Sequence, residues 1–207
     1  MKIIYRGAES IIYLDEFKGE EVIVKERIKK NYRIDQIDKE LRKARTRKEV
    51  KLLTEARKAS VPTPQILYVS DFDHKMMMEN VTGQRLKELL YKADKKAVTK
   101  TCLEIGKLIG KLHSAGIIHG DLTTSNIILK DKQIYFIDFG LGFFSKKTED
   151  QGTDLNLLYE ALKSTHFKIL KLCWNNILKG YKQEYRDAEK VLKRIEDIEK
   201  RARYAKR

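Results

Sequence analysis

A short polar loop and one later aspartate constrain this chain more than any other feature of its sequence. Asp121 and Asn126 lie five positions apart between two apolar stretches, and Asp138 follows the apolar segment 134–137, twelve positions beyond Asn126. Buried elements on either side of the loop can therefore bring these three side chains to one point. Moving a γ-phosphoryl group needs a carboxylate that positions or deprotonates the nucleophile, and oxygen ligands for the Mg²⁺ that neutralises the phosphates. The pattern predicts a phosphoryl-transfer site in which Asp121 is the catalytic residue and Asn126 and Asp138 are the metal ligands.

The order of the residues in this region is more specific than their types. Single Asp and Asn residues in loops usually cap helices or form turns. Here His-Gly-Asp at 119–121 is followed by four residues, Asn126, an apolar triplet and then, at a strand end, Asp-Phe-Gly at 138–140. The set resembles the protein-kinase-like superfamily, and its His-Gly-Asp form resembles the small atypical and aminoglycoside-phosphotransferase branches rather than the common His-Arg-Asp form. The resemblance implies an α+β, two-lobe fold with an antiparallel sheet in the first lobe and a reduced helical second lobe.

The composition limits where and with what the protein works. Its 207 residues fit one compact unit or two small lobes that share a cleft. A formal net charge of +14, with 36% charged residues, predicts an anionic partner. Cys102 and Cys173 lie in apolar helical patterns without partners at metal-ligand spacing, so neither a disulfide framework nor a zinc site is indicated. Without a signal peptide or an apolar run near the ~20 residues of a membrane span, we expect a soluble, cytoplasmic protein with no membrane partner.

Turn residues and hydrophobic periodicity divide the chain into a strand-rich first part and a helix-rich second part. We expect the first lobe over residues 1–79, a hinge over 80–83, the helical second lobe with the catalytic loop over 84–199, and a basic tail over 200–207. Expected strands are 2–5, 11–14, 21–25, 66–69, 75–78 and 134–137. Expected helices are 34–59, which Pro62 and Pro64 end, 86–91, 97–114, 153–164, and from about 166 to the end of the chain.

A lysine and a glutamate in the first lobe are expected to form an ion pair. Lys25 ends an apolar strand, a position where many lysines are simply solvated. Glu49 shares a helix face with Leu52 and Ala56, so it points inward, where an unpaired carboxylate would be costly. The two residues match the kinase pair in which a strand lysine, held by a helix glutamate, steadies the phosphates.

The loop that covers the phosphates in ordinary protein kinases is reduced here. No Gly-x-Gly-x-x-Gly occurs, and only residues 6–10 join the first two expected strands. Backbone N–H groups of that loop can still cradle an anion. Methionines at 76–78 lead into the expected hinge, where backbone groups would bind adenine, although methionine clusters more often fill a core. The residues expected to bind the nucleotide are Gly7, Ala8, Glu9, Ser10, Lys25, Glu49, Met78 and Glu79.

Two features of typical protein kinases are absent from the sequence, which limits the substrate, and one further aspartate can support the catalytic loop. Thr123 stands two residues past Asp121, where many serine/threonine kinases carry a lysine that neutralises phosphate. Only about fourteen residues follow Gly140 before the next helix, without Ala-Pro-Glu, which leaves no room for a regulated activation loop or peptide platform. Asp154, at the start of that helix, is expected either to accept hydrogen bonds from the catalytic-loop backbone, as in the superfamily, or to be an ordinary N-terminal helix carboxylate.

Several longer strings narrow the resemblance to one branch of the superfamily. They are 27–33, 45–49, Val-Pro-Thr-Pro at 61–64, the acidic run from 149 to 154, and 164–166. Together they resemble, over nearly the whole chain, the small kinase/ATPase subunit of the KEOPS complex, related to the p53-related protein kinase and more distantly to RIO kinases. The resemblance implies ATP and Mg²⁺ as cofactors. It also implies an ATPase that supports a TsaD-type synthase and the other KEOPS subunits in making threonylcarbamoyladenosine at tRNA position 37, with serine/threonine or autokinase activity in isolation.

Basic residues gather in two segments. Residues 25–51 hold 12 basic and 5 acidic residues, and the tail 200–207 holds five basic residues and no acidic one. Charged surface helices with a frayed end would have the same composition. The other interpretation is that both segments contact the phosphate backbone of tRNA or an acidic partner protein.

Three alternative functions stay open at the level of sequence. A small-molecule phosphotransferase would need extra helices around a substrate pocket, which 207 residues barely allow. A RIO-type ATPase or kinase of ribosome assembly would place different strings around Lys25 and a flexible loop in the first lobe. A non-catalytic tRNA-binding scaffold would show no ATP turnover.

Overall fold

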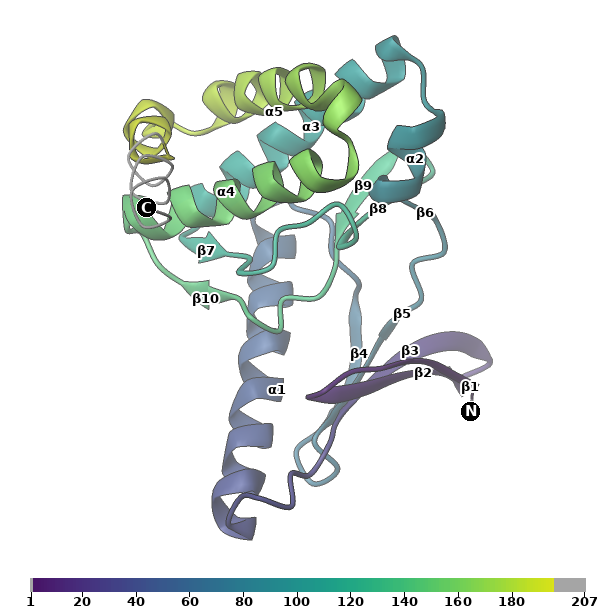
Figure 1. Ribbon diagram of the computed structural model, residues 1–207. Coiled ribbons are helices and arrows are strands. Elements are labelled where there is room, and N and C mark those ends of the chain that lie inside the picture. Colours follow the sequence, from purple (N-terminus) through teal and green to yellow (C-terminus); the bar gives the residue numbers. More distant parts are fainter. Residues whose placement is uncertain (1, 196–207) are drawn as a thin grey trace.

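The computed structural model describes residues 2–195 and arranges them in two lobes (Figure 1). The first lobe holds a five-stranded antiparallel sheet in the order β1-β2-β3-β5-β4. Alternation along β3 buries Val22 and Val24, which form a small core with Tyr13 of β2. The bounds are β1 Lys2–Arg6, β2 Ser10–Phe17, β3 Glu20–Arg27, β4 Ile66–Ser70 and β5 Lys75–Glu79.

One long helix, α1 (Asp35–Lys58), runs beside this sheet and reaches the second lobe (Figure 1). Acidic residues in its first turn and basic residues in its last complement the helix dipole. Leu52, Leu53 and Ala56 on its buried face belong to the main hydrophobic core. Glu49 lies one turn earlier on the same face and is also buried. The helix therefore brings a carboxylate to the point where the sheet meets the second lobe.

The second lobe consists mainly of helices, with short strands beside the loops that carry the polar motifs. The helices are α2 (Leu86–Lys92), α3 (Lys95–Ser114), α4 (Thr148–Thr165) and α5 (Leu170–Glu184), with a 3-10 turn over Phe167–Ile169. β6 (Gln84–Arg85), β8 (Ile127–Lys130) and β9 (Gln133–Phe136) form one small sheet, and β7 (Ile117–Ile118) pairs with β10 (Phe143–Phe144). Residues 188–195 are again helical.

Two glycines let α3 and α5 pack backbone to backbone in the second lobe. A Cβ atom on Gly106 would lie 2.0 Å from the backbone oxygen of Ile177, and one on Gly180 would lie 2.0 Å from that of Leu103. Any side chain at either position would force the helices apart. This close crossing anchors α3, which leads directly through β7 into the catalytic loop.

The predicted α+β, two-lobe architecture is confirmed. The differences lie at the ends of elements, in an interrupted last helix and in the short strands β6, β7 and β10, which were not predicted. Helix α4 begins at Thr148 rather than 153, because Ser145 donates to Asp150 and accepts from the N–H of Lys147, an N-terminal arrangement outside the apolar pattern. Only residues 141–147 thus separate Gly140 from α4. The last helix is interrupted, since the backbone at Tyr185 is extended.

Two further expectations concern the chain as a whole. Within residues 2–195, no helix is both long and apolar enough to cross a membrane. The basic tail predicted over 200–207 lies outside the described residues.

Candidate active site

Lys25, Glu49 and Asp138 meet although they come from three distant parts of the chain. The Nζ atom of Lys25 lies 2.6 Å from Oε1 of Glu49 and 2.7 Å from Oδ1 of Asp138. Lys25 belongs to β3, Glu49 to α1, and Asp138 follows β9 of the second lobe. The predicted ion pair between Lys25 and Glu49 is therefore present, and a third group from the other lobe completes it.

The charges in this cluster compensate one another. Burial alone would lower the pKa of Lys25, but the carboxylates of Glu49 and Asp138 outweigh it and raise that pKa above its ordinary value. Burial alone would raise the pKa of Asp138, but Lys25 and the N–H of Gly140 bring it below its ordinary value. Both groups are therefore charged at neutral pH, which suits Lys25 to phosphate and Asp138 to a cation.

Asp121 and Asn126 contact each other within the catalytic loop. The side-chain amide of Asn126 donates to a carboxylate oxygen of Asp121 and to its backbone oxygen, both at 2.9 Å. The N–H of Asn126 also bonds to the backbone oxygen of Thr123, which closes the loop. These bonds use the donor end of the Asn126 amide. Its oxygen, the atom that binds metal ions, stays available.

Asp154 on α4 holds the backbone of the catalytic loop. Its carboxylate accepts from the N–H of His119 at 2.8 Å and from that of Gly120 at 2.9 Å, and His113 Nε2 lies 3.3 Å away. Burial alone would raise the pKa of Asp154, but His113 and the hydrogen bond from His119 lower it. Of the two roles considered for Asp154, the structure shows the one in which it accepts from the catalytic loop.

Steric crowding explains why the middle residue of the His-Gly-Asp motif is glycine. Gly120 has a φ of 79°, and a Cβ atom there would lie 2.4 Å from the backbone oxygen of Leu141. No side chain, arginine included, fits while the segment after Gly140 keeps this course. Asp138 itself has a φ of 62°, a conformation that Asp tolerates better than most residues. Together these two backbone conformations let the Asp-Phe-Gly segment lie directly against the catalytic loop.

His119 links the two motifs, a role that the sequence did not reveal. Its Nε2 lies 3.1 Å from the backbone oxygen of Ile137, its Nδ1 accepts from the N–H of Asp121 at 3.3 Å, and its ring packs 4.4 Å from that of Phe139. Burial lowers the pKa of His119. The ring is therefore neutral, with its proton on Nε2, and it fixes Asp121 relative to the strand that leads to Asp138.

A cavity of about 620 Å³ lies beside these groups and is bounded by both lobes. One part of its wall is apolar and another carries the charged cluster, which suits a ligand with a flat base and anionic phosphates. The lining includes the predicted Lys25, Glu49, Met78, Asp121, Asn126 and Asp138, the hinge residues 80–83, and Ile4, Tyr5, Ile12, Ile23, Arg85 and Ile128, which the sequence did not single out.

The hinge differs in detail from expectation at Glu79. Its backbone N–H donates to the oxygen of Gln65 at 2.8 Å, and its carboxylate lies 3.4 Å from Nζ of Lys130. Glu79 does not line the cavity, whereas Asn80 and Val81 do. The backbone N–H of Glu79 is thus already bonded and is not free to bind adenine, and the residues that line the cavity at the hinge are 80–83.

The predicted phosphate loop is tied to the start of α1. Glu9 pairs with Arg33 and Arg45, and its backbone oxygen accepts from the N–H of Ile28. Lys30 donates to the oxygen of Ala8, and the N–H of Gly7 bonds to the oxygen of Ser10. None of the four residues 7–10 lines the cavity in this structure. The loop is therefore a short, anchored turn rather than a long flap.

Asn126 and Asp138 fit the coordination habits of Mg²⁺. The described residues hold no cluster of three or more His, Cys, Asp or Glu side chains suited to a metal ion. Mg²⁺ is usually held by one or two protein oxygens together with substrate phosphates and water. Asn126 and Asp138 both line the cavity and offer two such oxygens.

The fold and the site define an atypical enzyme of the protein-kinase-like class. Residues 12–146 match the RIO domain. The chain is 47% identical to the KEOPS complex subunit Bud32 of Pyrococcus abyssi, over all of this chain and 98% of that protein. It is 39% identical to a probable serine/threonine-protein kinase BUD32 homolog of Archaeoglobus fulgidus, over 99% of this chain and 97% of that one. The chain therefore belongs to the RIO domain family, within it to the Bud32 kinases.

Longer relatives and solved structures agree with this assignment. The chain is 43% identical to a probable bifunctional tRNA threonylcarbamoyladenosine biosynthesis protein of Methanosarcina mazei, covering 99% of itself but only 36% of that protein. Two solved structures share the fold: WaaP in complex with acyl carrier protein (TM-score 0.68, 16% identity, 97% and 88% of the two chains) and the Rio2 kinase of Chaetomium thermophilum in an ADP/Mg²⁺-phosphoaspartate complex (TM-score 0.61, 17%, 99% and 72%).

Proposed function

We propose that this protein binds ATP with Mg²⁺ in the cavity between its lobes and transfers the γ-phosphoryl group to water or to a hydroxyl acceptor. One observation carries the proposal: Lys25 bridges Glu49 of the first lobe and Asp138 of the second, at the wall of the cavity that Asp121 and Asn126 also line. A phosphoryl-transfer site needs these groups together.

Each side chain has one task in this proposal. Lys25 binds phosphate oxygens and Glu49 holds Lys25. Asp121 orients the nucleophile and accepts its proton, while Asn126 and Asp138 would hold Mg²⁺, which neutralises phosphate charge when bound. Because Lys25 is bonded to Asp138 here, we expect nucleotide binding to move its Nζ from that carboxylate to the phosphates.

We place the reaction in the modification of tRNA. The relatives named as a KEOPS subunit and as bifunctional threonylcarbamoyladenosine biosynthesis proteins support this proposal. In it, ATP turnover by this chain supports a TsaD-type synthase subunit within the KEOPS complex. In isolation the same site would phosphorylate serine or threonine hydroxyls, including its own.

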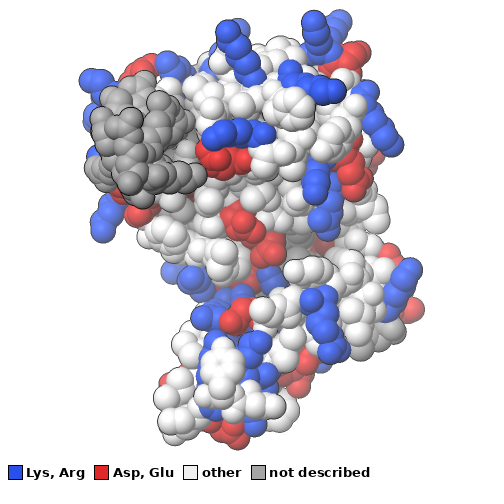
Figure 2. Space-filling view, in the orientation of Figure 1, with Lys and Arg blue, Asp and Glu red and all other residues white. Residues whose placement is uncertain are grey.

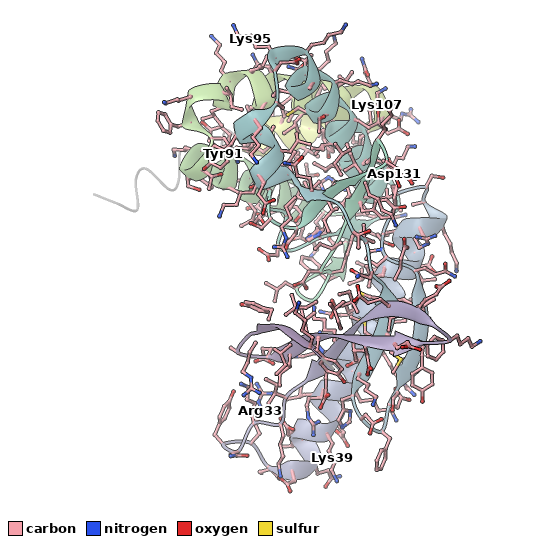
Figure 3. All side chains as sticks on the ribbon, turned by 90° about the vertical axis from the view of Figure 1, so that its right-hand side faces the viewer. Arg33, Lys39, Tyr91, Lys95, Lys107 and Asp131 are labelled. Carbon is pink, nitrogen blue, oxygen red and sulfur yellow. The ribbon has the colours of Figure 1, made fainter. Side chains whose placement is uncertain are left out.

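The basic segment 25–51 is our proposed contact for tRNA. All five of its arginines pair with carboxylates of the same lobe, which leaves less free charge than the sequence suggested. Lys39, Lys48 and Lys51 form no ion pair with another described residue, and Lys51 lies over the ring of Phe144. Arg33 and Lys39 lie at the end of the first lobe remote from the second (Figure 3). Lysines and arginines are scattered over both lobes on the face shown in Figure 2, among acidic residues, some of which lie where the lobes meet.

Stimulation of ATP turnover tests this function. ATP hydrolysis by the full chain is measured alone, with a synthase subunit plus tRNA, and with a peptide acceptor. The proposal expects ATP turnover to be faster with the synthase and tRNA together than with the chain alone. Stimulation by peptide alone would assign the protein to peptide phosphorylation, and absence of turnover under all conditions would favour a non-catalytic scaffold.

A further inference from the structure

The buried carboxylate of Glu49 has two cationic partners. Its Oε1 bonds to Lys25 at 2.6 Å, and its Oε2 bonds to Nη2 of Arg27 at 2.7 Å. The side chains of Glu49 and Arg27 are only 1% and 6% exposed, so this second ion pair is as dry as the first. The Lys25–Glu49 pair alone serves to hold the lysine, and Arg27 is additional to it.

The strand geometry explains how both cations reach one carboxylate. Lys25 and Arg27 are two positions apart on β3, so their side chains leave the same face of the sheet. The backbone N–H of Arg27 donates to the oxygen of His74 at 3.1 Å, and the hydroxyl of Thr46 on α1 lies 3.5 Å from that same oxygen. Arg27 is thus anchored where β3, the β4–β5 turn and α1 meet.

The two oxygens of Glu49 bond to different cations, and this matters because Lys25 itself bonds to two carboxylates. In this structure its single ammonium serves both Glu49 and Asp138. If phosphate weakens the contact between Lys25 and Glu49, a carboxylate without a second cation would be left buried and poorly paired, which is unfavourable. With Arg27 on Oε2, Glu49 keeps a paired charge whatever Lys25 binds. Gly140 packs on the same cluster, since a Cβ there would lie 3.3 Å from Lys25 Nζ and 3.5 Å from Glu49 Oε2.

We propose that Arg27 is a positioning residue that keeps Glu49, and with it α1, in the active arrangement independently of nucleotide, so that Lys25 is free to bind phosphate. The inference rests on the proposed function, because it assumes that Lys25 binds phosphate. It means that α1 needs no activating event to dock, in keeping with the short segment 141–147 that leaves little room for a regulatory loop.

The test compares two variants that each strip an arginine from a buried carboxylate of α1. Arg27→Met unpairs one oxygen of Glu49. Arg42→Met removes the partner of one oxygen of Asp38, whose other oxygen keeps Arg33; Asp38 is also buried but does not line the cavity. Mg²⁺-ATP binding, KM and kcat are measured for both in the full chain, well below their melting temperatures. Arg27→Met is expected to raise Kd and KM for ATP by roughly tenfold or more, the scale of one lost charge-assisted hydrogen bond. In the absence of tRNA, Arg42→Met is expected to lower the melting temperature and to leave Kd and KM for ATP unchanged.

Two further variants separate positioning from a structural role. Arg27→Lys keeps a cation and is expected to recover most of the ATP affinity. In a Glu49→Gln background, Arg27→Met is expected to have no further effect on KM, because the carboxylate it serves is gone. If Arg27→Met does not fold, the test uses the KM values of Arg27→Lys and of Glu49→Gln with and without Arg27→Met. Unchanged KM in Arg27→Met, or equal KM changes in Arg27→Met and Arg42→Met, would overturn the inference. Lack of ATP binding by the unmodified chain would instead refute the proposed function.

Discussion

The side-chain amide of Asn126 donates two hydrogen bonds to Asp121, one to its carboxylate and one to its backbone oxygen, both at 2.9 Å. The residues that we propose as proton acceptor and metal ligand are therefore directly bonded. Asp121 cannot turn without disturbing Asn126, whose side-chain oxygen is our proposed ligand for Mg²⁺. His119 adds a second restraint through the N–H of Asp121.

Replacing Asp121 by Asn should slow turnover without loosening nucleotide. The change keeps the shape of the side chain and removes the proton acceptor, so kcat is expected to fall by about 10² or more. The Kd for Mg²⁺-ATP should stay near that of the parent. Single-turnover rates and equilibrium binding measure the two quantities separately. A collapse of affinity with a preserved rate would make Asp121 a structural residue.

Lys25→Ala and Glu49→Ala should have non-additive effects on KM for ATP. Each change removes the same contact between the two side chains, so the double variant should lose little more than the worse single one. A double-mutant cycle measures the coupling. Lys25→Ala combined with Arg42→Ala, whose partner is Asp38, serves as the control pair and should add. Simple addition for Lys25 and Glu49 would show that their contact has no bearing on nucleotide binding.

Gly120→Ala should damage activity far more than Gly19→Ala. Both glycines have positive φ, 79° and 84°, so alanine is strained at each by about 1 kcal/mol. A Cβ at Gly19 meets nothing within 4 Å, whereas one at Gly120 collides with the backbone of Leu141. We expect a loss of at least about tenfold in kcat/KM for Gly120→Ala, the scale of a misplaced catalytic group. Equal losses in the two variants would mean that the contact with Leu141 is not needed.

The free energy of unfolding should fall as pH drops below about 6.5. Burial lowers the pKa of His119, although Asp154, Asp138 and Asp121 act in the opposite direction, and the unfolded chain therefore binds a proton that the folded chain does not. This contribution is complete above the unfolded pKa and is lost as pH falls toward the folded pKa. His74 and His166, whose pKa values burial also lowers, act with the same sign.

Denaturant unfolding at several pH values between 5 and 7.5 measures this dependence, and His119→Asn should make it shallower. An unchanged dependence in that variant would show that folding does not shift the pKa of His119, and a steeper one would show that folding raises it.

The central site was predictable because its residues are ordered along the chain in a way that few folds require. Glu49 could be chosen as the partner of Lys25 because helix phase decides which side of α1 faces inward, and that rule is local. Arg27 was not recognised, since a strand-end arginine in a basic segment looks like surface charge. Its burial depends on α1 and on the turn at His74, which lie far away in sequence.

The hinge and the wall of the cavity show in another way what local sequence patterns cannot predict. The pairing of Glu79 with Gln65 follows from the register of β4 beside β5, which no short-range rule fixes. Tyr5 and Arg85 line the cavity because two strands from different lobes end there, and neither carries a motif. Residues whose position is set by contacts between distant segments were not predicted. Those marked by the order of a motif or by helix phase were.

The most direct measurement of the central claim is the Mg²⁺ dependence of ATP turnover in the unmodified chain and in Asp138→Asn. Asparagine tolerates the positive φ of this position, so the fold should persist, while the charge that would hold the metal is removed. The account predicts Mg²⁺-dependent turnover in the parent and none in the variant, with similar circular dichroism and melting. Turnover in Asp138→Asn with unchanged Mg²⁺ dependence would contradict it.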